Sequence, residues 1–567
     1  MPLKKRAKWD RKNKHVLALA NAARNPVIQK LRVENISLKR RIRQQDDKIK
    51  NLVKEVAHLR LRSPAKKIVL DQLKSSSQRR ERIRRMESNS GNSVSFSFTD
   101  TEVELTVASA AAFKRAFDFT ENQYAALRRL SGRTVPSLYK VKNWTEYLIN
   151  ESGLVKKEID GVRFAIWSNP GYVFQRYFNR LLNTAWSGLL PAKIDIVVAG
   201  DRGGNVGSNW TKIGVFIPTN VPTAQSPCNF VLLAAYEGVE STENVREAGQ
   251  YALPFLNAIA AVKSYSYENV DIPANVLAVG DLKWLPFIVG SSHHASTTFC
   301  PICLVTRQQH RLQPSIGPLR ESNAQSLLQI DAQNVVVPPL HTLQGLVNTA
   351  LKALLSTDSN WLHAIFNNAK ITPSHQQSSL LNGRDCGRFL RFILNNKINA
   401  YYSHPKTGEN FNLMPVFEAI FNLERWAVAA SLEDENLDNL SSDIEKLSNE
   451  WRLVRLPVIN KLHLIEAHLA EFVKNHRSWG SYGEQGCEAL HHSANTAVLK
   501  CFGANAEKRL SFFLQQQLIT AFTNPAEFAP KQRSRSRSVT PEEEPMFFDG
   551  EINVAHDEIV EWYADDE

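Results

Sequence analysis

The chain has 567 residues, 43% of them hydrophobic and 22% charged, which is the balance of a globular protein with a sizeable core. It contains no run of about 18 apolar residues, and its basic start lacks an apolar segment, so membrane insertion and secretion are not expected. The six cysteines lack the spacing pattern of a disulfide framework, which favours a reducing compartment.

The net charge of +12 is distributed unevenly along the chain. Residues 1–90 hold 27 Lys and Arg against 8 Asp and Glu, whereas residues 531–567 hold 4 against 11, so the part between them is close to neutral. A localised basic arm is typical of binding to a polyanion, of nuclear import, or of both. The alternative interpretation is a solvated, disordered tail without a partner.

The predicted elements begin with a basic arm over residues 1–26, in which KKRAK at 4–8 has the composition of a nuclear-localisation signal. Residues 27–62 then carry a heptad repeat. Its a positions hold Ile28, Asn35, Ile42, Ile49 and Val56, and its d positions hold Leu31, Leu38, Gln45, Leu52 and Leu59. β-Branched residues at a with leucine at d favour a parallel two-stranded coiled coil, so the pattern predicts a homodimer. The alternatives are one amphipathic helix packed on the body, and a basic leucine zipper, which Pro26 disfavours because it interrupts the helix.

A Ser- and Arg-rich stretch without apolar periodicity, residues 63–105, is predicted to be a linker. Residues 106–190 have a helical pattern, with Thr120 as the cap of one helix and Pro136 just before a second. The arginines of this helical pair could contact DNA phosphates, although helical hairpins with incidental arginines are common.

Four short, β-branched, apolar runs predict strands within residues 191–299. They are IDIVVAGD, TKIGVFI, NFVLLAAYEG and NVLAVGD. Residues 300–475 are mostly helical in pattern, residues 476–523 are predicted to form a further helical part, and residues 524–567 are predicted to be a disordered acidic tail. The expected fold class is therefore α/β with a long helical insertion.

Two of the predicted strands end in an aspartate. Asp201 closes the first run and Asp281 closes the last. Carboxylates at the ends of neighbouring strands lie at the rim of a sheet, where they can share one divalent metal ion or two ions a few ångströms apart. An ordinary Gly-Asp turn after each strand is the alternative.

Cysteine and histidine residues follow at spacings typical of a zinc site. Cys300 and Cys303 form a Cys-x-x-Cys pair, and His463 and His468 offer a second pair of ligands. A spacing of five places the two histidines off one face of an ideal α-helix, so a local bend or a helix end is required. A redox dithiol and two ordinary helix histidines are the alternatives.

A third carboxylate is expected downstream, just after a glycine-rich break. Glu484 and Glu488 lie one helical turn apart in SYGEQGCEALHH, and Glu488 is the preferred candidate. The histidine pairs at 293–294 and 491–492 are rival metal ligands.

Taken in order, Asp201, Asp281, Cys300-x-x-Cys303, His463-x4-His468 and Glu488 resemble the catalytic core of the Transib-type transposases and of the V(D)J recombinase subunit derived from them. CACTA-like transposases have a similar zinc arrangement, and PPLHTLQGLVN at 338–348 is similar to a phrase found in invertebrate transposon-derived proteins. The resemblance covers roughly residues 190–500. The RING-type cysteines and the terminal-repeat-binding segment of the family are not matched.

The resemblance implies an RNase H-like core interrupted by a long helical insertion, with a structural Zn²⁺ on Cys300, Cys303, His463 and His468. It also implies that Asp201, Asp281 and Glu488 hold two Mg²⁺ or Mn²⁺ ions that promote DNA strand cleavage and strand transfer. A nuclear, homodimeric, DNA-cleaving protein without a small-molecule substrate is therefore expected. The alternatives are a domesticated relic that binds DNA without cutting it, and a coiled-coil scaffold in RNA processing.

Overall fold

The computed structural model describes residues 106–523, apart from gaps at 117–118, 131–134, 205–208, 220–225, 293–294, 323–324, 357–358, 373–374, 377–379 and 502–503. The predicted basic arm, coiled coil, linker and acidic tail lie outside the described residues. Residues 106–122 and 137–523 belong to one compact unit. A second unit includes residues 123–136 and so most of α6 (Glu121–Leu130), where the Tyr124 hydroxyl donates to the Pro136 carbonyl. Among the described helices, none has the length and apolar character needed to cross a membrane.

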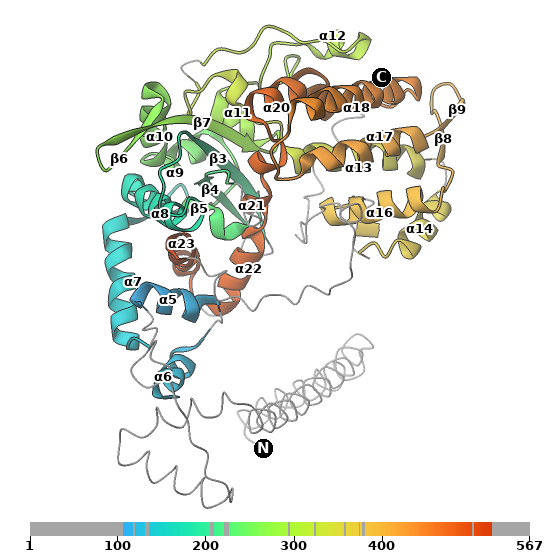
Figure 1. Cartoon of the computed structure of the whole chain (residues 1–567). Coiled ribbons are helices and arrows are strands. Elements are labelled where there is room, and N and C mark those ends of the chain that lie inside the picture. Colours follow the sequence, from blue (N-terminus) through green and yellow to red (C-terminus); the bar gives the residue numbers. More distant parts are fainter. Residues whose placement is uncertain are drawn as a thin grey trace, which may run out of the picture. The chain divides into compact units, whose positions relative to one another are not determined.

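A mixed seven-stranded sheet forms the core of the larger unit (Figure 1). Its strands are β1 (Leu154–Ile159), β2 (Val162–Trp167), β3 (Ile194–Gly203), β4 (Trp210–Phe216), β5 (Val231–Glu237), β6 (Ser264–Tyr267) and β7 (Val270–Gly280). They lie in the order β1-β2-β5-β4-β3-β7-β6, and within this sheet β3 and β7 are parallel while the other neighbours are antiparallel. The C-terminal ends of β3 and β7 therefore share one edge of the sheet.

The four strands predicted from the β-branched runs are present as β3, β4, β5 and β7. β4 is buried along its whole length, and β5 is buried up to its last residue, as expected of central strands that are covered on both faces. Close packing explains the glycine before Asp201, because a Cβ atom on Gly200 would lie 2.2 Å from the ring of Trp284.

The expectation that residues 106–190 are helical is wrong at β1 and β2, which form an antiparallel hairpin. Its turn consists of Asp160 and Gly161, both with positive φ (50° and 79°), as in a two-residue turn of the Asp-Gly type. The charged run Lys156–Glu158 lies on an edge strand with no fully buried residue, so β1 lacks the apolar pattern of the central strands.

Several helices pack against the sheet, because each has an apolar face that is buried there. These helices are α8 (Pro170–Thr184), α9 (Thr242–Ala248), α10 (Ala252–Val262), α11 (Trp284–Val289) and α23 (Ala506–Phe522). Helix α5 (Val107–Ala116) packs against α7 (Leu138–Ser152) and α23, and α7 also contacts α8. In α8 the buried residues Val173, Phe174, Tyr177, Phe178 and Leu181 repeat at helical spacing. Both α8 and α23 contact β5, so segments from opposite ends of the described chain cover the same strand.

A helical region follows the sheet in sequence. It contains α12 (Arg307–Leu312), α13 (Pro339–Leu355), α14 (Ser359–Asn368), α16 (Gly383–Asn395), α17 (Met414–Glu424), α18 (Asp434–Leu453), α19 (Asn460–Leu464) and α20 (Ala470–His476). A small hairpin, β8 (Tyr401–Ser403) with β9 (Asn410–Asn412), interrupts it. Helix α13 lies at its centre and contacts α14, α16, α17 and α19. Figure 1 shows these helices as a body beside the sheet.

The chain returns to the sheet on both sides of this helical body. Just before α13, Val335 forms a parallel bridge with Ala278 of β7. After α20, the short helix α21 (Gln485–Glu488) contacts β3 and continues into α22 (Leu490–Lys500). Helix α21 therefore packs beside β3, the strand that carries Asp201.

Candidate metal centres

A buried Cys₂His₂ cluster forms between the loop after the sheet and the end of the helical body. The ligand atoms of Cys300, Cys303, His463 and His468 all lie within 4.8 Å of one another. Cys300 Sγ is 3.4 Å from His468 Nε2, Cys303 Sγ is 3.4 Å from His463 Nε2, and the two Nε2 atoms are 3.2 Å apart. Tetrahedral Zn²⁺ with ordinary bond lengths separates its ligands by about 3.3 to 3.8 Å, so this cluster could hold a structural metal such as zinc.

A π-helical turn explains how histidines five residues apart reach one site. The helix is α-helical as α19 over Asn460–Leu464, π-helical over Ile465–Leu469 and α-helical again as α20. A π-helix bonds residue i to residue i+5, so residues at that spacing share a face. The bend that the sequence required between His463 and His468 is therefore present as this turn.

The surroundings of the cluster suit thiolate ligands. Cys300 Sγ accepts backbone hydrogen bonds from Ile302 (3.3 Å) and Cys303 (3.4 Å). The hydrogen bond from Cys300 and those of the two histidines lower the pKa of Cys303, whereas burial and the neighbouring Cys303 raise the pKa of Cys300. Arg320 stabilises the loop that carries Cys300, since its Nε donates a hydrogen bond to the Cys300 carbonyl at 2.7 Å. The chemistry of the donor set thus fits Zn²⁺.

A second cluster lies at the edge of the sheet where β3 and β7 end. The parallel register pairs Gly200 with Gly280, so Asp201 and Asp281 follow at adjacent positions. Asp281 Oδ1 accepts backbone hydrogen bonds from Lys283 (2.9 Å) and Trp284 (2.7 Å) at the start of α11. These bonds fix the orientation of the Asp281 carboxylate.

Glu488 reaches this edge from α21 and is surrounded by imidazoles. Its Oε1 lies 2.8 Å from His341 Nε2, and its Oε2 lies 3.2 Å from His491 Nδ1. The other ring nitrogen of His491 lies 2.6 Å from Asp201 Oδ2. The ligand atoms of Asp201, His341 and Glu488 all lie within 4.8 Å of one another. Asp281 is not part of that group, so the structure brings Asp201 and Glu488 together and leaves Asp281 on the neighbouring strand.

The electrostatics of this edge favour the charged forms of Asp201 and His341. Burial by itself would raise the pKa of Asp201, but His491 and, more weakly, Lys212 and His341 lower it below its usual value. Burial would lower the pKa of His341, but the hydrogen bond and charge of Glu488 raise it to about 10. Ionised carboxylate oxygens are the ligands that Mg²⁺ and Mn²⁺ prefer, so the donor set fits these ions.

Glu484, the rival third carboxylate, has a different role in the structure. Its Oε1 accepts a hydrogen bond at 2.9 Å from the backbone N–H of His341, in the first turn of α13. Helix α13 begins after Pro338, which offers no capping side chain, so Glu484 satisfies one of the free N–H groups of that turn. Glu484 therefore caps α13, and Glu488 faces Asp201.

Three neighbours of the carboxylates were not predicted from the sequence. His341 lies in the first turn of α13, and Lys212 lies on β4, where its Nζ donates to the carbonyls of Gly203 (2.9 Å) and Trp210 (3.0 Å). Glu240 follows β5, and burial together with the charges of Asp281 and Asp201 raises its pKa to about 9. An acidic residue just after another strand of the sheet, β5, was the signal available for Glu240.

The rival histidine pairs are only partly described. His491 is buried between Asp201 and Glu488, so it belongs to the carboxylate cluster, whereas His492 is exposed. Residues 293–294 lie outside the described part of the chain.

A side-chain hydrogen bond joins the segment before α21 to strand β3 of the sheet. The Tyr482 hydroxyl donates to Asp195 Oδ2 at 2.5 Å, and Asn275 Nδ2 donates to Asp195 Oδ1 at 3.1 Å. Burial by itself would raise the pKa of Asp195, but His476 and Tyr482 lower it to about 2. Since Asp195 lies on β3 and Tyr482 lies just before α21, this contact sets the position of Glu488 relative to Asp201.

Replacing Asp195 with asparagine should lower the free energy of unfolding by about 2 kcal/mol at neutral pH, because the pKa of this group falls from an ordinary 3.8 to about 2 on folding. A carboxyl group whose pKa is lower in the folded state than in the unfolded state stabilises the fold at any pH above the unfolded-state pKa. This stabilisation disappears as the pH falls through the folded-state pKa. The difference between wild type and Asp195→Asn in urea unfolding should therefore shrink between about pH 5 and pH 2. The exposed Asp271→Asn should show no such change, and a pH-independent loss in Asp195→Asn would contradict the account.

Comparison with known proteins identifies no relative: no family model matches this chain, and no curated protein matches it.

Proposed function

We propose that this protein is a DDE-type transposase or recombinase that cleaves and joins DNA strands with divalent metal ions. The observation that carries the proposal is the convergence of Asp201 and Glu488 at one edge of the sheet, next to the strand that ends in Asp281. Asp281, Asp201 and Glu488 come from three separate elements, and the Asp195–Tyr482 contact holds two of these elements in register.

The arrangement of the strands supports the same proposal. In the order β5-β4-β3-β7, β5 is antiparallel to β4, β4 is antiparallel to β3, and β3 is parallel to β7. Val335 forms a further short parallel bridge with β7. This order is the one expected of an RNase H-like core. The Cys₂His₂ cluster, with Zn²⁺ as the proposed occupant, would join the loop after β7 to the end of the helical body, close in sequence to α21.

The residues of the chain have distinct parts in this chemistry. Asp201 and Glu488 would supply oxygen ligands, and backbone hydrogen bonds hold Asp281 in one orientation for the same purpose. When bound, Mg²⁺ or Mn²⁺ supplies an activated water and stabilises the departing 3′ oxygen. Lys212 is buried beside Asp201, where burial lowers its pKa and the Asp201 carboxylate opposes that shift.

A DNA-binding protein without nuclease activity is the second candidate function. It is favoured by the ion pairs of Glu488 with His341 and of Asp201 with His491, which place a positive charge beside each carboxylate without a metal ion. Incubating supercoiled plasmid with the full chain and Mn²⁺ separates the two functions. The proposed enzyme nicks the plasmid and Asp281→Ala does not, whereas equal nicking by both proteins, or none by either, would favour the second candidate.

The predicted coiled coil gives a further test, because an enzyme acting on two DNA ends requires two active sites. We expect the full chain to be a homodimer and to become a monomer when residues 1–62 are removed. Light scattering measures both masses. An unchanged mass after truncation would show that residues 1–62 do not make the dimer contact.

A further inference from the structure

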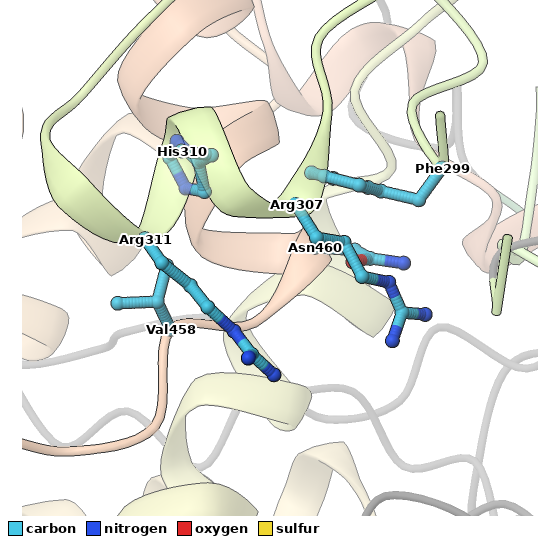
Figure 2. Close-up of a pocket in the computed structure, with 6 residues that line it drawn as sticks. All are labelled: Phe299, Arg307, His310, Arg311, Val458 and Asn460. Carbon is cyan, nitrogen blue, oxygen red and sulfur yellow. The ribbon is translucent and has the colours of Figure 1, made fainter. Parts of the chain in front are cut away.

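A small pocket beside the Cys₂His₂ cluster is lined by basic and amide side chains. Its walls are formed by Phe299, Arg307, His310, Arg311, Val458 and Asn460 (Figure 2). Arg307 and Arg311 lie one helical turn apart on α12, and Figure 2 shows both side chains leaving that helix toward the segment with Val458 and Asn460. The pocket is therefore a junction between two segments that are far apart in sequence.

The two walls are basic and contain no acidic residue. Residues 296–320 include Arg307, Arg311 and Arg320 without any Asp or Glu, and residues 452–463 include Arg452, Arg455 and Lys461 without any Asp or Glu. The chain between its charged ends is close to neutral, so this is a local concentration of positive charge.

Glu466 lies beside His310 and is held by basic residues of these two segments. Glu466 forms an ion pair with Arg452 and lies 3.3 Å from His310 Nε2. The arginines that line the pocket are Arg307 and Arg311.

The Cys₂His₂ cluster sets the spacing of the two walls. Thr306, three residues after Cys303, begins α12 with a complete capping box, and Asn460 begins the helix that carries His463. The ring of Phe299 packs against that of His463, with their centroids 5.3 Å apart. Both walls are thus attached to ligands of the same cluster, which makes the pocket a preformed site.

We propose that this pocket binds a phosphate group of the DNA backbone. Guanidinium groups donate paired hydrogen bonds to phosphate oxygens, and the amide of Asn460 is a neutral donor of the kind that accompanies them. The proposal rests on the proposed function, because it names a surface by which a DNA-cleaving protein positions its substrate. This contact does not distinguish between bases; it contributes affinity for DNA and fixes the position of the protein along the duplex.

The test compares Arg307→Gln/Arg311→Gln with a control of equal charge, Arg425→Gln/Arg477→Gln, whose arginines are exposed and paired with Asp443 and Asp434. Binding of the full chain to a duplex DNA of arbitrary sequence is measured across a series of salt concentrations. The pocket variant should lose about tenfold in affinity near 0.1 M salt, and its log–log salt slope should become shallower by about one. The control should match the wild type, and zinc content should stay the same in all three proteins.

A second measurement locates the contact. Arginine-directed labelling of the wild-type chain, read by mass spectrometry, should show Arg307 and Arg311 protected by duplex DNA and Arg425 unprotected. Wild-type affinity and salt slope in the pocket variant, without protection of these arginines, would overturn the pocket proposal and leave the proposed function standing. Failure of the wild-type chain to bind DNA at any salt concentration would overturn both.

Discussion

Replacing Glu488 with glutamine is expected to reduce Mn²⁺-dependent DNA cleavage by about a thousandfold, because a neutral amide cannot replace a charged metal ligand that faces Asp201. The substitution is nearly isosteric and keeps an acceptor toward His341, so the fold should be retained. Single-turnover cleavage of a labelled duplex, together with the thermal unfolding midpoint, measures the two effects separately.

Glu484→Gln is the matched control for this prediction. Glu484 caps α13 by accepting a hydrogen bond from the backbone of His341, and glutamine keeps an acceptor oxygen at that position. Burial raises the pKa of Glu484 above its usual value. Cleavage by Glu484→Gln should stay within a few-fold of wild type. A larger loss of cleavage in Glu484→Gln than in Glu488→Gln would show that Glu484, and not Glu488, is the metal ligand.

Replacing Cys300 and Cys303 with serine should remove one zinc ion per chain and lower the free energy of unfolding by on the order of 5 kcal/mol. A hydroxyl is a poor ligand for Zn²⁺, and the two histidines would remain buried without their metal. The segment with His463 and His468 leads to α21, so cleavage should fall as well. Metal analysis and urea unfolding measure the first two effects.

The control for the zinc prediction is Cys228→Ser/Cys501→Ser, which changes two partly exposed cysteines outside the cluster. This variant should keep its zinc and its stability. Equal zinc content in the Cys300→Ser/Cys303→Ser protein and the wild type would show that the Cys₂His₂ cluster is not the zinc site.

The sequence predicted the strands that carry the aspartates, because central strands are apolar and rich in β-branched residues. It missed the hairpin of β1 and β2, where the Asp160-Gly161 turn was the available signal and charged residues obscured the strand pattern. Edge strands are exposed, so their pattern depends on tertiary contacts rather than on local composition.

The four Cys and His residues could be predicted from spacing alone, but the helix geometry that unites them could not. Local propensity favours an α-helix through His463 and His468, and the π-helical turn depends on packing around the cluster. Likewise, no local pattern distinguishes Glu488 from Glu484. Their roles depend on His341, which α13 brings from a distant part of the chain.

Binding of Mn²⁺ to the purified, zinc-loaded chain, followed by the paramagnetic resonance signal of free Mn²⁺, is the most direct measurement of whether Asp201 and Glu488 form a divalent-metal site. The wild-type chain should take up Mn²⁺, Glu484→Gln should take up the same amount, and Asp201→Asn and Glu488→Gln should lose it. Equal Mn²⁺ uptake by all four proteins, or none by the wild type, would contradict a metal site at this edge of the sheet.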